Sequence, residues 1–364
     1  MKKTRNLTDF RIHILLCLFL LPFISSWAQE SANTSGLNPG AFKLFQSDEL
    51  IEMTISFDMS EVLRDVGDDR TYHDASVSYT EADGREINLP ARIRTRGHFR
   101  RDPINCNFPP LRLDFSESET ENTIFEGQDG LKLVAHCRTR SNEFEQYVVK
   151  EYLVYRLYNL FTEESYRVRL SRITYEDING KKKPITKLGF FIEPTDQMVK
   201  RNNCEEVDVQ NVHQESTNKE KIMMLCVFQY MVGNTDWSVQ ALHNIVLLRK
   251  DPLSPPVAVP YDFDWCGLVN APYAFPAPQL GIDNVRQRRF WGYCRPEEDY
   301  LVAFELFREK KPEIYDLCEN LPYIDQGELK QIIKYMDEFY KIIDNPKSTN
   351  YEFYTKCREY EGNL

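Results

Sequence analysis

The chain carries the stretch Tyr261-Asp262-Phe263-Asp264-Trp265-Cys266-Gly267 directly after a short apolar segment, Val257–Pro260. Upstream lie Gly233-Asn234-Thr235-Asp236-Trp237 and then His243-Asn244, which leads into the apolar segment Ile245–Leu248. Short apolar runs bounded by polar residues are typical of buried strands, so both polar stretches lie at predicted strand ends. An acid, an amide and a pair of acids follow one another in the order of a catalytic base and magnesium ligands. This order predicts phosphoryl-transfer chemistry.

The first acid and the amide are Asp236 and Asn244. In a phosphoryl-transfer site, Asp236 takes or orients the proton of an acceptor hydroxyl, and Asn244 gives its amide oxygen to a magnesium ion. They lie eight residues apart, which is longer than the spacing of the ordinary catalytic loop. The alternative is that Asp236 is a turn residue that accepts backbone hydrogen bonds.

The second acidic pair, Asp262 and Asp264, flanks Phe263. On an extended backbone, alternate residues share one face, so we expect both carboxylates to point the same way. Two hard oxygen ligands suit Mg²⁺ or Mn²⁺, which also binds phosphate oxygens. The alternatives are a structural calcium site and a hydrogen-bonded turn.

Strand patterns dominate the first part of the chain, and helical patterns dominate the last. The predicted strands, which turn signals separate, are Ile51–Met59, Ala75–Tyr79, Ile87–Arg94, Pro110–Phe115, Leu131–His136, Tyr166–Thr174 and Thr186–Ile192. A capping box at Asn142 and Glu145 predicts one long helix between the fifth and sixth strands. After a polar loop, helices are predicted at Lys221–Val232, Tyr300–Arg308 and Leu329–Ile343. We therefore expect an α+β protein.

Four motifs resemble those of the CotH-type secreted kinases, a family of atypical protein kinases. They are Arg92–Gly97, the proline-led strand Pro109–Leu113, the helix segment Glu151–Leu157 and the stretch Asp262–Asp264. The resemblance, to a divergent exported branch, implies a bilobal protein-kinase-like fold. It places a β-rich N-lobe at 51–195, a linker at 196–220 and a helical C-lobe at 221–364. It also implies ATP bound between the lobes with Mg²⁺ or Mn²⁺, and an exported protein or a small hydroxyl compound as acceptor.

The nucleotide would be held by residues of the first lobe. Lys132 lies in a strand pattern and Glu151 on the helix after it, so they can form the lysine–glutamate pair that positions phosphates. They can equally be an outward-facing lysine and a solvated acid. Arg96 and Gly97 belong to an arginine-rich stretch that could close over phosphates. The alternatives are a solvated face or a site for an acidic substrate, with some of the arginines only balancing carboxylates. Glu193 ends a strand where a hinge would contact adenine. The family's lysine before the proline-led strand is missing here.

The first residues predict export. Lys2, Lys3 and Arg5 precede an apolar run, and Ser26-Trp27-Ala28 supplies small residues for cleavage, so we expect a signal peptide at 1–28 and a leader at 29–50. No later segment is apolar enough to span a membrane. The protein is therefore expected in the periplasm or outside the cell. Its net charge of −11 argues against nucleic-acid partners.

Cysteine usage fits an oxidising compartment. Eight cysteines remain after residue 28, an even number that permits disulfides whose pairing the sequence leaves open. Cys226 and Cys266 lie in apolar surroundings and are predicted to be buried thiols.

Three functions are compatible with these patterns. The first is an exported kinase that uses ATP. The second is a catalytically silent module of the same fold, which binds a ligand, a glycan or a protein. The third is a calcium-binding structural protein of the cell surface.

Overall fold

Seven strands close into a barrel in the computed structural model, which describes residues 40–359. They are β1 (Ile51–Phe57), β2 (His73–Thr80), β3 (Glu86–Thr95), β4 (Leu111–Asp114), β5 (Gly130–Val134), β6 (Val168–Asp177) and β7 (Ile185–Ile192). Their order around the barrel is β1-β2-β3-β4-β5-β7-β6. Neighbours are antiparallel except β1 and β6, which pair in parallel with Ile51 opposite Ser171. This last pairing leaves the barrel without an open edge.

The closed barrel shows that the expected bilobal protein-kinase-like fold is wrong. That fold requires a β-sheet lobe, whereas here β6 returns to β1 and makes a mixed barrel. The pairing joins segments about 120 residues apart, so no local pattern could reveal it. The positions of the predicted strands are confirmed, because every one overlaps a strand of the barrel.

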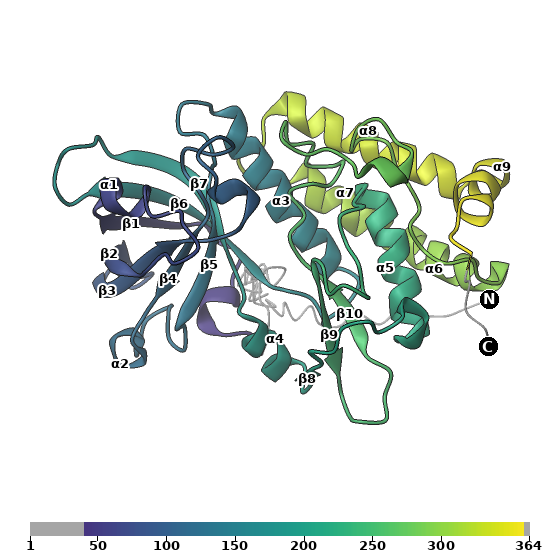
Figure 1. Cartoon of the computed structure of the whole chain (residues 1–364), viewed down its shortest axis with the longest axis horizontal. Helices are drawn as coiled ribbons and strands as arrows, with labels where there is room; N and C mark the ends of the chain where they lie inside the picture. The colour runs from purple at the N-terminus through teal and green to yellow at the C-terminus, as the bar shows by residue number, and fades with distance from the viewer. Residues whose placement is uncertain (1–39, 360–364) are drawn as a thin grey trace, which may run out of the picture. The chain divides into compact units, whose positions relative to one another are not determined.

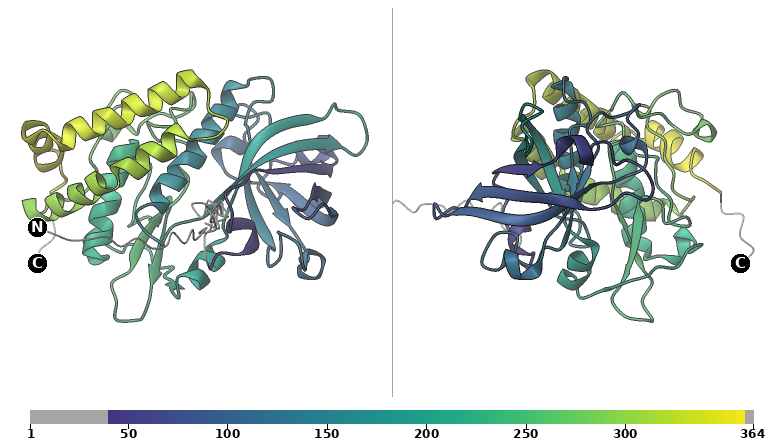
Figure 2. Two further views of the ribbon diagram at one scale, coloured as in Figure 1. Left: turned by 180° about the vertical axis from the view of Figure 1, so that it is seen from behind. Right: turned by 60° about the vertical axis from the view of Figure 1, so that its left-hand side comes forward.

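Helices gather beside the barrel and cover part of it (Figure 1). The longer ones are α3 (Glu143–Asn159), α5 (Lys219–Val232), α6 (Glu297–Glu309), α7 (Lys311–Glu319) and α8 (Gln326–Ile343), and the shorter ones are α1 (Met59–Val62), α2 (Glu117–Thr120), α4 (Thr195–Arg201) and α9 (Pro346–Thr349). A second sheet contains β8 (Glu205–Glu206), β9 (Ile245–Arg249) and β10 (Val257–Pro260). Seen from behind, the helices still lie on one side and the barrel on the other (Figure 2).

Two hydrophobic cores meet at the barrel wall. One fills the barrel interior and includes Leu113, Leu133 and Phe191. The other includes Phe190; in it α3 packs against the outside of β6 and β7, and buried residues of α5 and α8 continue the core. Successive residues of a strand point to opposite faces, so Phe190 and Phe191 join the two cores through one strand. The barrel and the helices that follow belong to one compact unit.

Several local predictions need correction. The capping box of α3 does not form, because Asn142 and Glu145 both accept hydrogen bonds from the Lys187 ammonium group. The polar loop expected at Lys200–Asn218 includes the end of α4 and the short strand β8. Within residues 40–359 no helix is long and apolar enough to cross a membrane. The predicted signal peptide lies outside the described residues.

Two disulfides form among the described cysteines. They join Cys106 to Cys137 and Cys294 to Cys357. Cys226 and Cys266 are buried free thiols, which confirms the prediction for both. The first disulfide joins the loop between β3 and β4, part of which lines the site described below, to the residues after β5.

His136 provides a pH test of the barrel. Its ring is fully buried, with its centroid 4.4 Å from that of Phe108 and 5.9 Å from that of Tyr175. Burial lowers the pKa of His136 to about 3, and Lys187 adds to the effect. The folded protein therefore keeps this ring neutral while the unfolded chain protonates it below about pH 6.5. The corresponding stability is present above that pH and is lost as the pH falls toward 3.

We predict that His136→Gln reduces the loss of stability between pH 7 and pH 4 by at least about 1 kcal/mol. Urea unfolding at a series of pH values measures the effect. His98→Gln, at an exposed histidine, serves as the control and should keep the wild-type pH dependence. An unchanged slope in His136→Gln would show that this ring is protonated in the folded state.

Candidate functional site

A cavity of about 420 Å³ lies between the barrel and the second sheet. Its lining comprises Arg96, Gly97, His98, Phe99, Arg100, Pro110, Asp236, His243, Asn244, Asp262, Asp264 and Trp265. These residues come from the β3–β4 loop, the segment between α5 and β9, and the segment after β10. The volume is in the range of small-molecule sites. The structure thus brings together six of the predicted site residues.

Asp236 is held by two neighbours. Its Oδ1 lies 2.8 Å from His243 Nε2, and its Oδ2 accepts a hydrogen bond of 3.1 Å from Asn244 Nδ2. Helix α5 ends at Gly233, whose φ of 70° is in the left-handed region that glycine adopts easily, and the chain then turns toward the cavity. Because Asn244 uses its Nδ2 on Asp236, its Oδ1 is the atom that remains for a cation. A side chain oriented on both oxygens can accept or position a proton.

Asp262 and Asp264 converge without the expected extended backbone. Asp262 has a φ of 61°, which is in the left-handed region, so the prediction of alternate residues on one extended face is wrong. The Asp262 backbone N–H donates a hydrogen bond of 2.8 Å to the Tyr155 hydroxyl. Both carboxylates nevertheless reach one guanidinium, that of Arg100, at 3.7 Å and 3.2 Å. The shared cation, rather than strand alternation, brings them together.

Arg100 occupies the centre of an acidic cluster in which Glu151 and Asp264 are buried and Asp262 is partly exposed. Its guanidinium also lies 3.6 Å from Glu151 of α3, so it faces three carboxylates. Burial raises the pKa of Glu151 and of Asp264, and Arg100 opposes the shift in both. One guanidinium cannot balance three ionised carboxylates, so the cluster favours a proton or a further cation. One oxygen of Glu151 is buried without a hydrogen-bond partner.

Lys132 and Glu151 do not form the expected pair, because Glu151 binds Arg100 instead. Lys132 lies over the ring of Tyr261, with 5.6 Å from Nζ to the ring centroid. Burial lowers its pKa to about 8, and the nearby charges of Arg96 and Arg112 act in the same direction, while Asp262 opposes them. Lys132 therefore stands beside the cavity and interacts electrostatically with two of its lining residues.

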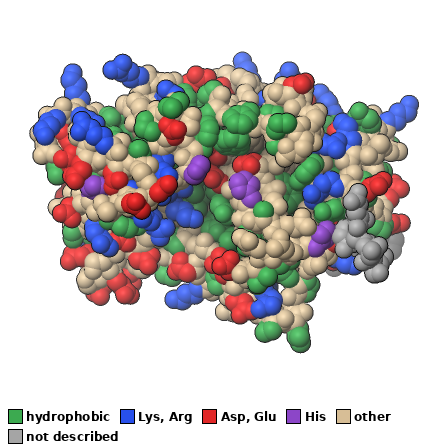
Figure 3. Space-filling view, viewed as in Figure 1, with side chains coloured by type: hydrophobic (Ala, Val, Ile, Leu, Met, Phe, Trp, Pro, Cys, Tyr) green, Lys and Arg blue, Asp and Glu red, His purple; other side chains and the backbone are tan. Residues whose placement is uncertain are grey.

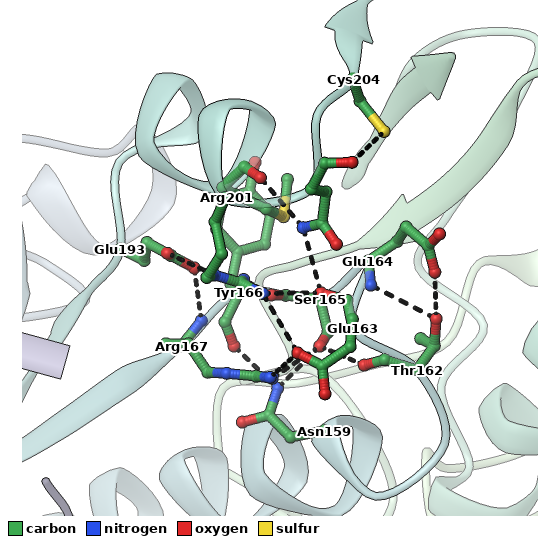
Figure 4. Close-up of polar contacts among 12 residues, drawn as sticks. Asn159, Thr162, Glu163, Glu164, Ser165, Tyr166, Arg167, Glu193, Arg201 and Cys204 are labelled. Atoms are coloured by element: carbon green, nitrogen blue, oxygen red, sulfur yellow. Dashed lines mark hydrogen bonds and ion pairs between the residues drawn. The ribbon is translucent and has the colours of Figure 1, made fainter. Parts of the chain in front are cut away.

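Glu193 does not join the cavity. Its carboxylate is fully buried and is bound by Arg201 at 2.9 and 3.0 Å and by the backbone N–H of Arg167 at 2.9 Å (Figure 4). The Arg201 side chain also donates to the backbone oxygens of Glu163 and Ser165. Glu193 therefore has a structural role, because it joins the end of β7 to α4.

The donor set fits a magnesium-type ion only in part. No group of three or more His, Cys, Asp or Glu side chains among residues 40–359 is arranged to hold a metal. Asp262 and Asp264 supply two carboxylates, and Asn244 supplies an amide oxygen in the same cavity. Mg²⁺ is commonly bound by one or two carboxylates together with water and substrate phosphates. These three side chains are therefore the ones that could hold it.

Sequence reasoning missed the central role of Arg100 and the contact of His243 with Asp236. Arg100 stood among several arginines, and nothing local separated it from its neighbours. His243 lies beside Asn244 in the quoted motif, and that adjacency was the available signal. Phe99 and Trp265 also line the cavity and pack edge to face, with centroids 5.2 Å apart.

No family model matches the chain, and no curated protein matches it significantly. The resemblance to secreted kinases therefore rests on the quoted motifs.

The role of Glu193 can be tested through its partner. We predict that Arg201→Met lowers the free energy of unfolding by about 3–5 kcal/mol, because it leaves a buried carboxylate without its cation. Arg249→Met is the matched control, since the Arg249–Glu205 pair is partly exposed and its loss should cost at most about 1 kcal/mol. Urea unfolding measures both variants. Equal, small losses would mean that the Glu193 carboxylate is accessible to solvent.

Proposed function

We propose that this protein transfers a phosphoryl group from ATP, or a similar nucleoside triphosphate, to a hydroxyl acceptor with the help of Mg²⁺ or Mn²⁺. One observation carries the proposal: Asp236, Asn244, Asp262 and Asp264 line the same cavity as Arg96 and Arg100. Phosphoryl transfer depends mainly on positioning and on charge stabilisation, so a base, metal-binding oxygens and cations at one place suit it.

Each side chain has a proposed role. Asp236, which His243 and Asn244 orient, takes or positions the proton of the acceptor hydroxyl. Asp262 and Asp264, with the Asn244 amide oxygen, hold the cation, which would offset charge on the transferred group. Arg96 lies at the cavity wall and would contact phosphate oxygens. Gly97, with a φ of 82°, lets the loop turn there and leaves open space at its Cα.

The proposed acceptor is an exported protein or a small hydroxyl compound outside the inner membrane. The signal-peptide pattern supports export, and so do the two disulfides, since disulfides persist in oxidising compartments.

A catalytically silent binding module is the second candidate, and Arg100 favours it. Its guanidinium already contacts Glu151, Asp262 and Asp264, so a fixed cation lies among the carboxylates that would hold a metal. Such a protein could bind a ligand in the cavity without transferring phosphate. No comparable observation favours a calcium-binding structural protein, because calcium takes six to eight oxygen ligands.

The proposal predicts separate effects for two aspartates. ATP with Mg²⁺ or Mn²⁺ should raise the melting temperature of the mature protein and label a hydroxyl acceptor with the γ-phosphate. Asp236→Asn should keep the thermal shift and reduce phosphate transfer by about 10² or more, because only the proton-handling group is lost. Asp262→Asn should lose the part of the shift that depends on the metal. Thermal melting and radiolabel transfer measure these outcomes.

Glu119→Gln, at an exposed acid on α2, controls for the removal of one negative charge. It should behave as the wild type in both assays. Stabilisation of the wild type without transfer to any acceptor would support the silent module. A wild type that neither gains stability nor transfers phosphate would contradict phosphoryl transfer and a silent module that binds ATP.

A further inference from the structure

Three cations stand side by side on the outer wall of the barrel. Arg94 of β3 is the register partner of Arg112 of β4, and Arg112 is the partner of Lys132 of β5. Register partners project from the same face of a sheet, and strands lie about 4.8 Å apart, so the row extends about 10 Å. The flanking residues Ile93, Leu113 and Leu133 are fully buried inside the barrel. The cationic row, Arg94, Arg112 and Lys132, therefore faces outward.

The cationic row has no ion-pair partner among the described residues, and the acids that act on it are Asp262 and Glu206, near Lys132. Among residues 40–359, none of its three members makes an ion pair within 4.0 Å, whereas Arg92 on the same strand face pairs with Asp114. Buried Nε atoms of Arg94 and Arg112 also have no hydrogen-bond partner. Like charges directly opposite one another on a sheet destabilise it. A ligand that carries several negative charges would offset this repulsion.

The cationic row leads into the cavity. Arg96, two residues after Arg94, lines the cavity; burial lowers its pKa, and the nearby charge of Asp262 opposes that shift. Burial lowers the pKa of Lys132, and the charges of Arg96, Arg112 and Asp262 also act on it, so these charges are neighbours. In Figure 1, β5 lies toward the helices, with β4 and β3 beyond it, and in Figure 3 basic side chains lie beside the hollow at the centre of the same face. The row thus lies across the barrel wall beside the cavity, two residues before Arg96 on β3 and two residues after Pro110 on β4.

We propose that the cationic row binds a chain of condensed phosphates whose terminal phosphate enters the cavity. Arg94, Arg112 and Lys132 would each contact phosphate oxygens of the chain. The inference rests on the proposed function for the direction of the chain, and it adds the residues that select the donor. A nucleoside triphosphate and inorganic triphosphate share this chemistry, so both are candidate ligands.

Phosphate suits the row better than other anions for a structural reason. Guanidinium groups present several N–H donors in a fixed fork that matches phosphate oxygens, and two of the three cations are arginines. The exposed acid Glu206 is near enough to affect Lys132 and would disfavour a large polyanion that spreads over the surface. The net charge of −11 acts in the same direction against nucleic acid.

The test measures binding separately from transfer. Isothermal titration of the full mature chain uses inorganic triphosphate, ATP, pyrophosphate and citrate, with EDTA present so that no metal contributes. Arg94→Gln and Arg112→Gln should each weaken triphosphate binding at least about tenfold, because each removes a charged contact. Arg92→Gln, on the same face of the same strand, should change it less than twofold. Citrate, a carboxylate anion, should bind at least tenfold more weakly than triphosphate.

A second readout guards against misfolding. Removing Arg112 relieves like-charge repulsion, so Arg112→Gln should raise the melting temperature without ligand while it weakens phosphate binding. If Arg112 had only a structural role, Arg112→Gln would lower both the melting temperature and the affinity for triphosphate. Equal weakening for ATP and inorganic triphosphate assigns the contacts to the phosphate chain, and binding of ATP alone assigns the donor as a nucleotide.

The inference and the proposed function can fail separately. If the wild type binds ATP and inorganic triphosphate but transfers no phosphate, the phosphate-binding role of the row is supported and the proposed function is wrong. If Arg94→Gln and Arg112→Gln both transfer phosphate from ATP and bind triphosphate as the wild type does, the row does not bind the phosphates. Tighter binding of citrate than of triphosphate would overturn the assignment to phosphate.

Discussion

The buried guanidinium of Arg100 is the contact on which the site depends. It lies on the β3–β4 loop and faces Glu151 of α3 together with Asp262 and Asp264 after β10. Three separate segments are thus held by one cation. Since a buried carboxylate without a partner is costly, each of these segments is fixed relative to the barrel by the same charge. Arg100 alone does not balance these three carboxylates when all of them are ionised.

Barrel closure decides where this contact can form. The parallel pairing of β1 with β6 completes the wall, and α3 then packs against β7 and carries Glu151 toward the β3–β4 loop. The two faces of the barrel wall also have different roles. Inward side chains fill an apolar core, and outward side chains of β3, β4 and β5 present the cationic row. A single sheet therefore supplies both stability and a charged surface beside the cavity.

Much of the local structure was predictable because its signals are local. The repeat of apolar residues located β1 to β7 and the helices α3, α5, α6 and α8 to within a few residues. The cavity residues Asp236, Asn244, Asp262 and Asp264 were identified from their order near strand ends. Predictions that needed a partner fared differently. Glu151 binds Arg100 rather than Lys132, and Glu193 is enclosed by Arg201, because partners far apart in sequence leave no periodic signal.

The sequence by itself determined the kinds of elements, their order and the acidic and amide side chains that meet in the cavity. These depend on side-chain periodicity and on residue chemistry, which are readable over short windows. Only the tertiary structure decided that the strands close into a barrel, that Arg100 is the shared cation and that Arg94, Arg112 and Lys132 stand abreast. Each of these features is a pairing between distant segments, and its free energy depends on distances that exist only after the chain has folded.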